Sequence, residues 1–133
     1  MFIPTLLLKK LYTLGSLTNV EQGVRFGIKN RLSNVDITAV LSVTIDGAPV
    51  SLDQVAIHLP GGRILAASAV SASTPIEFPL GMVFTLVAKR APIEPGKHTI
   101  ALSVKTKTFG KLSFDVEDTI QEGTHQLVRI PRD

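Results

Sequence analysis

The sequence predicts an all-β protein, an antiparallel sandwich with a short helix at its N-terminus. After Thr13, apolar residues alternate with polar or small ones, as in strands that bury one face. Eight prolines and ten glycines fall mostly between these runs. Short strands at close spacing, with turn residues between them, are typical of a sandwich or a barrel.

The short helix is expected within residues 1–13. Pro4 suits the first turn of a helix, and Leu7, Leu8 and Leu11 then fall on one face. A helix of this length is marginal by itself and must pack on something. Two interpretations stay open: the helix covers its own sandwich, or it docks on a partner.

Four runs are predicted to be strands. "GVRFGIKNRL", "DITAVLSVTID" and "QVAIHL" alternate, and the second is expected to turn Ile37, Ala39, Leu41, Val43 and Ile45 inward. "GMVFTLVAK" is apolar on both faces, which predicts a central strand covered on both sides. The pairs Asp46-Gly47 and Gly61-Gly62 predict two-residue hairpin turns, and "AASAVSASTP" predicts a long loop.

His98 begins the run "GKHTIALSVKT" directly after Pro95-Gly96. It shares the inward parity of Ile100 and Leu102. Immunoglobulin-like sandwiches often place a tyrosine at such a corner, where its hydroxyl bonds to nearby backbone. A histidine can form the same bond through a ring nitrogen, so we expect His98 to hold the corner rather than to act as a catalyst or metal ligand.

The next turn is expected to be a three-residue loop, Thr108-Phe109-Gly110, with Gly110 in the left-handed conformation. This loop would set Val104 opposite Phe114 and Leu102 opposite Val116. Lys105 and Lys107 would then lie near Asp115 on the outer face, as exposed cross-strand pairs.

Length and composition indicate one domain over residues 1–133, with a tail over 119–133. Fourteen basic against eleven acidic residues is a mild excess without a dense basic run, so no nucleic-acid partner is expected. The sequence has no cysteine, which fits a reducing compartment. The N-terminus does not resemble a signal peptide, and prolines and a glutamate interrupt the longest apolar region. We therefore expect a cytoplasmic protein without a membrane partner.

No catalytic, cofactor-binding or metal-binding residue is predicted. His58 alternates away from its apolar neighbours and His125 lies in the tail, and neither has a second ligand at metal spacing. Asp115 and Glu117 are expected on a solvated face, with Asp118 beside them. A site built from Glu77, Arg63 and His58 on loops is possible without any sequence signal for it.

The order "GVRFGIKNRL", "LSVTIDGAPVSLDQVAIHLPGG" and "FPLGMVFTLVAKRAPIEPGKHTIALSV" resembles the small β subunits of bacterial C-glycoside deglycosidases over about residues 20–118. The shared features are a V-x-[IV]-D-G hairpin and a late P-G-x-H strand. The resemblance implies a β-sandwich subunit without a cofactor of its own, in a lyase complex whose larger barrel subunit carries a divalent metal and the acid–base residues.

The leading expectation is thus a non-catalytic sandwich subunit of such a complex. Two alternatives stay open: a small lyase or isomerase that acts in an apolar cavity, and a self-associating binding module. Leftover apolar surface favours a chain that is not a monomer. It would either self-associate or bind a larger subunit, through an interface above about 1,000 Å².

Overall fold

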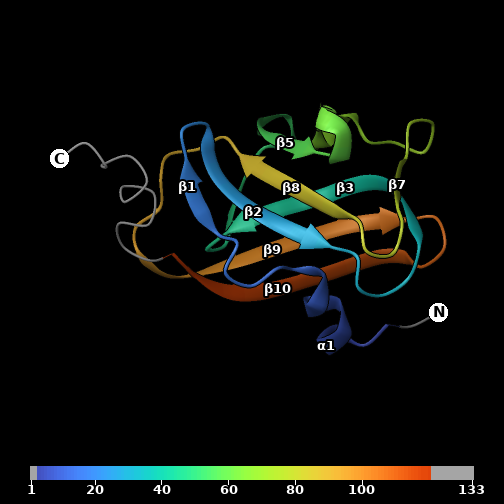
Figure 1. The fold of residues 1–133 in the computed structure, drawn as a ribbon, viewed down its shortest axis with the longest axis horizontal. Helices are drawn as coiled ribbons and strands as arrows, with labels where there is room; N and C mark the ends of the chain where they lie inside the picture. The colour runs from blue at the N-terminus through green and yellow to red at the C-terminus, as the bar shows by residue number, and fades with distance from the viewer. Residues whose placement is uncertain (1–2, 121–133) are drawn as a thin grey trace.

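The computed structural model of the chain describes residues 3–120 (Figure 1). Ten strands account for most of these residues, with one short α-helix and several single 3₁₀ turns. The elements are α1 Thr5–Leu8, η1 Lys9–Leu11, β1 Thr18–Val20, β2 Gly23–Lys29, β3 Val35–Ile45, β4 Ala48–Pro49, η2 Leu52–Gln54, β5 Val55–His58, η3 Pro60–Gly62, β6 Ile64–Ala66, η4 Ala67–Ala69, β7 Ile76–Phe78, β8 Val83–Ala88, β9 Gly96–Thr106 and β10 Gly110–Ile120.

The strands form two antiparallel sheets that pack face to face. The first has the order β1-β2-β8-β5-β6, and the second has the order β10-β9-β3-β4, with β7 paired to β3. Alternate residues of the long strands point between the sheets, as the burial of Val24, Phe26 and Ile28 on β2 shows. The predicted antiparallel sandwich with a short N-terminal helix is confirmed.

Aromatic pairs fill the interior. Phe78 stacks on Phe84 with ring centroids 4.4 Å apart, and Tyr12 stacks on Phe26 at 5.7 Å. Tyr12 also meets the ring of Phe114 edge-on at 6.3 Å. Since Phe26 lies in one sheet and Phe114 in the other, Tyr12 joins the two layers from the side.

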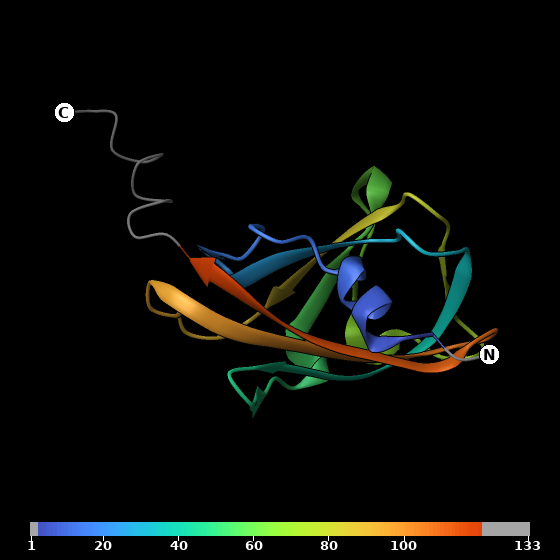
Figure 2. The ribbon, with the colours of Figure 1, turned by 90° about the horizontal axis from the view of Figure 1, so that it is seen from below.

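The N-terminal segment closes one open side of the sandwich, between β2 and β10 (Figure 2). Leu8 is buried there and Leu11 is half-buried, but Leu7 remains 40% exposed. Because the helix has only four residues before it tightens into a 3₁₀ turn, the predicted apolar stripe does not form as a unit. The helix covers its own sandwich through Leu8, while Leu6 and Leu7 stay exposed.

Strand β3 departs from simple alternation. Its pairing with β9 is irregular between Ile37 and Ala39 and again between Val40 and Ser42. Each bulge adds a residue and reverses which face the next side chain occupies. Val40 is therefore buried and Leu41 exposed, so the prediction that Ala39 and Leu41 point inward was wrong.

The β9–β10 hairpin is shifted by two residues from the predicted register. Gly110 pairs with Thr106, which places Phe114 opposite Leu102 and Val116 opposite Ile100. The side-chain hydroxyl of Thr106 accepts a bond from the Phe109 amide and donates to the Gly110 carbonyl, so it closes the turn earlier than expected.

The shifted register changes the surface ion pairs. Asp115 lies 3.5 Å from Lys9, and Glu117 lies 3.7 Å from Lys97, instead of the predicted pairing of Asp115 with Lys105 and Lys107. The predicted left-handed conformation of Gly110 is confirmed, with φ of 67°.

Other predictions hold in part. The Asp46-Gly47 turn joins β3 to β4 with positive φ at both residues, as expected. The Gly61-Gly62 hairpin is present, but its loop is longer, because Leu59 and Arg63 bond across a 3₁₀ turn. Residues 66–75 are largely irregular, as predicted.

Strand β8 is central in its sheet, as predicted, but its outer face is covered only in part, because Val87 is buried and Val83 is exposed. Strand β10 runs to Ile120, past the predicted start of the tail at 119. Among the described residues, no helix is long and apolar enough to cross a membrane.

We predict that Gly23→Ala destabilises the protein far more than Gly110→Ala. A Cβ on Gly23 would lie 2.1 Å from the Ala88 carbonyl oxygen on the neighbouring strand, whereas a Cβ on Gly110 meets no atom within 4 Å. We expect a loss of about 3–4 kcal/mol for Gly23→Ala and about 1–2 kcal/mol for Gly110→Ala. Denaturant unfolding measures both, and equal losses would contradict the close approach of β2 and β8.

Candidate functional site

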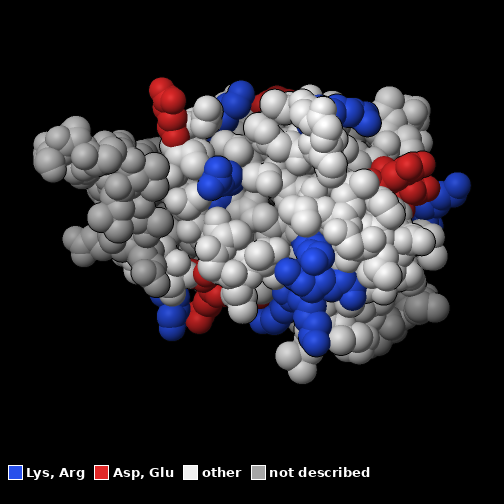
Figure 3. Space-filling model, viewed as in Figure 1, with Lys and Arg blue, Asp and Glu red and all other residues white. Residues whose placement is uncertain are grey.

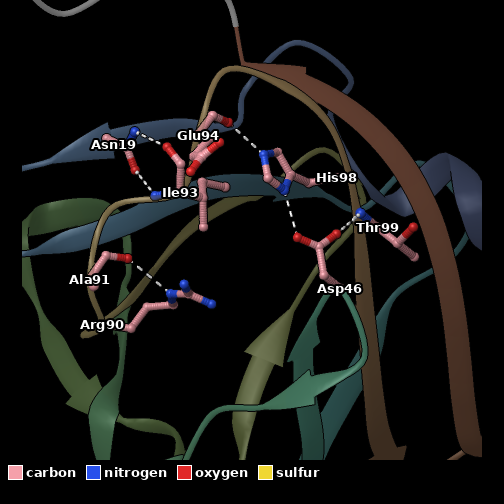
Figure 4. Close-up of polar contacts among 8 residues, drawn as sticks. All are labelled: Asn19, Asp46, Arg90, Ala91, Ile93, Glu94, His98 and Thr99. Carbon is pink, nitrogen blue, oxygen red and sulfur yellow. Dashed lines mark hydrogen bonds and ion pairs between the residues drawn. The ribbon is translucent and has the colours of Figure 1, made fainter.

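His98 lies at the corner where the chain leaves one sheet and enters the other (Figure 4). Its Nε2 is 2.6 Å from the carbonyl oxygen of Glu94, and its Nδ1 is 2.6 Å from the Asp46 carboxylate. The predicted bond from the ring to nearby backbone is therefore present. The second bond reaches the β3–β4 turn, and this partner was not predicted.

Both partners of the ring are acceptors, which favours its charged form. A carbonyl oxygen and a carboxylate can only accept, so both bonds form together only when both ring nitrogens donate, as in the protonated imidazole. Partial burial lowers the pKa of His98, but the bonds to Asp46 and to the Glu94 carbonyl outweigh this effect and raise it. The bond from His98, followed by that from the Thr99 amide, lowers the pKa of Asp46.

The β8–β9 connection, which carries Glu94, is itself held in place by hydrogen bonds. The side chain of Asn19 donates to the Ile93 carbonyl at 2.8 Å and accepts from the Ile93 amide at 3.0 Å. This reciprocal pair ties the β8–β9 connection to the edge strand β1 (Figure 4). Both ring nitrogens of His98 are bonded within the chain, so the ring joins the β8–β9 connection to the β3–β4 turn. We call His98 with Asp46 and Glu94 the His98 clasp.

A second polar centre surrounds Asp118, near the end of β10. The carboxylate, 7% exposed, accepts bonds from the Tyr12 hydroxyl at 2.8 Å and the amides of Gly15 at 3.0 Å and Leu17 at 3.2 Å. The Thr119 amide adds a fourth donor. The sequence analysis placed Asp118 beside a solvated face and missed this role, although its inward parity with Phe114 and Val116 was a signal.

Tyr12 is held in a protonated state at this centre. Burial raises the pKa of its hydroxyl far above the ordinary value, and the bond to the Asp118 carboxylate raises it further. The hydroxyl therefore acts as a donor to Asp118 and not as a proton acceptor.

The other residues considered from sequence do not converge on one site. His58 lies on the outer face of its sheet, opposite Thr85 and Ile64. Arg63 and Glu77 line one surface hollow together with Asp36, but His58 does not reach it. Asp115 and Glu117 are exposed, as predicted, and His125 lies outside the described residues. Residues 3–120 contain no group of three or more side chains placed to hold a metal ion.

The His98 clasp should make stability depend on pH. The raised pKa of His98 means that its contribution is complete below the unfolded value of 6.5 and is lost as the pH rises through the folded value. The lowered pKa of Asp46 means that its contribution is present above 3.8 and is lost as the pH falls through the folded value. The pair therefore stabilises most between about pH 4 and 6.5.

We predict that His98→Gln costs about 1–2 kcal/mol at pH 5.5 and less at pH 8.5, because only the protonated ring fills both acceptors. Thermal unfolding of the wild type and the variant at both pH values measures this difference. His58→Gln is the control and should show no comparable change with pH. A His98→Gln cost that grows with pH would contradict a protonated clasp.

We predict that Asp118→Asn costs about 2–3 kcal/mol, because an amide group cannot accept from all four donors and leaves buried groups unpaired. Tyr12→Phe should cost less, about 1–2 kcal/mol, since the backbone donors remain. Asp115→Asn, on the same strand but exposed, is the matched control, with a change below about 0.5 kcal/mol. Denaturant unfolding at neutral pH measures all three, and equal effects at Asp118 and Asp115 would refute the buried carboxylate.

Comparison with protein families finds one match. The model for "Hydroxymethylglutaryl-CoA reductase, N-terminal domain" covers residues 7–121, which include every strand of both sheets. Comparison with curated protein sequences finds no match.

This match corrects the resemblance to C-glycoside deglycosidase β subunits, and with it the expected lyase complex and barrel subunit. It supports neither alternative expectation, the small lyase or isomerase or the self-associating module. The motifs behind the resemblance have structural causes here: Asp46-Gly47 forms a hairpin turn, and His98 holds a corner. Such features recur wherever a sandwich needs them, so they do not identify a family. The chain belongs to the family of the hydroxymethylglutaryl-CoA reductase N-terminal domain.

Proposed function

We propose that this chain is the β-sandwich part of a hydroxymethylglutaryl-CoA reductase assembly, that it binds the catalytic part, and that it does not carry out the reduction itself. The observation that carries the proposal is the family match over residues 7–121, since the family is defined as one domain of that enzyme. We also propose a cytoplasmic location, because a chain without cysteine suits a reducing compartment.

The two polar centres support a non-catalytic role. Each buried or half-buried ionisable side chain in them already has partners from its own chain: His98 bonds Asp46 and Glu94, and Asp118 bonds Tyr12 and backbone amides. A general acid or base must be free to exchange a proton with substrate, whereas these groups are committed to holding the fold.

Exposed apolar side chains support a role in assembly. Leu6, Leu14, Ile64 and Leu80 are each more than half exposed. Apolar surface of this kind on a folded domain is typical of contact with another protein when it is contiguous.

We predict that the purified full chain binds the catalytic part of a hydroxymethylglutaryl-CoA reductase from the same organism. Sedimentation velocity at low micromolar concentration should show a complex heavier than either component, and the melting temperature of the chain should rise as its partner is added. The chain alone, supplied with a reduced nicotinamide cofactor as hydride donor, should leave hydroxymethylglutaryl-CoA unchanged, measured as release of the coenzyme A thiol.

Two results would contradict the proposal. Turnover of the thioester by the chain alone would make it an enzyme in its own right. Separate sedimentation of the two proteins, with no change in melting temperature, would remove the assembly role. His98→Gln is a useful control, since a structural clasp away from the interface should leave binding unchanged at a temperature where the variant is folded.

A further inference from the structure

A surface hollow of about 560 Å³ lies beside the N-terminal segment, at the side of the sandwich that this segment closes. We call it the basic hollow. Lys9, Lys10, Tyr12, Leu14, Arg31 and Glu117 line it. Figure 3 shows Lys and Arg side chains gathered over α1 and the neighbouring end of β2.

Two of the charges in the basic hollow are already neutralised. Lys9 pairs with Asp115 at 3.5 Å, and Glu117 pairs with Lys97 at 3.7 Å. Within residues 3–120, Lys10 and Arg31 have no carboxylate at ion-pair distance. The hollow therefore presents two uncompensated positive charges.

Arg31 is held in place before any partner arrives. Its guanidinium donates to the carbonyl of Lys10 at 2.7 Å and to the Thr13 hydroxyl at 3.3 Å. A guanidinium has five N–H donors in a rigid fork, so further donors remain to bind an incoming carboxylate. Leu14 lines the same hollow and is 71% exposed, which adds an apolar contact to the charged ones.

We propose that the basic hollow is where the sandwich binds the catalytic part, and that its occupant is a segment with one or more carboxylates beside an apolar side chain. The carboxylates bind Lys10 and Arg31, and the apolar side chain packs on Leu14. This inference rests on the proposed function and names the surface that performs it.

The family match favours a protein segment over a lipid surface, because it makes this chain one domain of an enzyme, and domains of one protein contact each other. The charges of the hollow agree with this occupant. Asp115 and Glu117 are already paired with lysines, so Lys10 and Arg31 are left to bind the carboxylates of the segment.

The test compares single variants in binding to the catalytic part by biolayer interferometry. Lys10→Glu should slow association by about fivefold or more, since it reverses a charge that steers the partner. Leu14→Ser should raise Kd by about tenfold through faster dissociation. Lys111→Glu and Leu41→Ser are matched controls, exposed residues on other surfaces, and should bind as the wild type does.

The outcomes separate this surface from the proposed function. Binding by the wild type with undiminished binding by Lys10→Glu and Leu14→Ser would refute the basic hollow and leave the assembly role intact. Failure of the wild type to bind would refute both. Co-sedimentation of the wild type with phosphatidylserine vesicles, lost in Leu14→Ser, would assign the hollow to a membrane and overturn the proposal.

Discussion

The buried carboxylate of Asp118 is the interaction on which the closed side of this sandwich depends. A charged group out of water is costly unless it is paired and hydrogen-bonded, and here the donors come from a segment about one hundred residues away. Satisfying Asp118 therefore holds residues 12–17, which lie beside β2 of one sheet, against β10 of the other. Once that segment is in place, Tyr12 packs against Phe26 and Phe114, and the core is sealed on this side.

The same constraint positions the surface that we propose as the binding site. Arg31 donates to carbonyls of the N-terminal segment, and Leu14 projects from the turn whose Gly15 amide bonds Asp118. The basic hollow therefore forms only if the segment is anchored. At another corner, Asn19 and His98 hold the β8–β9 connection in a similar way, with partners taken from both sheets. In both places, hydrogen bonds of polar groups hold a segment that contacts both sheets. Apolar packing alone would fix the position of such a segment less firmly.

The motifs shared with C-glycoside deglycosidase β subunits have structural causes in this chain and are not specific to one family. A turn with two positive φ values favours Asp-Gly in any hairpin, and a corner needs a side chain that can bond to backbone in any sandwich. These requirements explain Asp46-Gly47 and His98 without reference to an activity. The family match draws instead on the whole of residues 7–121, and it connects the chain to a different enzyme.

The sequence by itself determined the fold class, the Asp-Gly turn, the left-handed Gly110 and the corner position of His98, because each follows from alternation or from the local backbone conformation. Only the tertiary structure decided the rest. Two bulges in β3 reversed the faces of Val40 and Leu41, and the Thr106 hydroxyl shifted the last hairpin by two residues. The raised pKa of His98 and the burial of Asp118 depend on partners 52 and 106 residues away. Periodicity reports which face a residue occupies, but it carries no information on which distant donor or acceptor will meet it there.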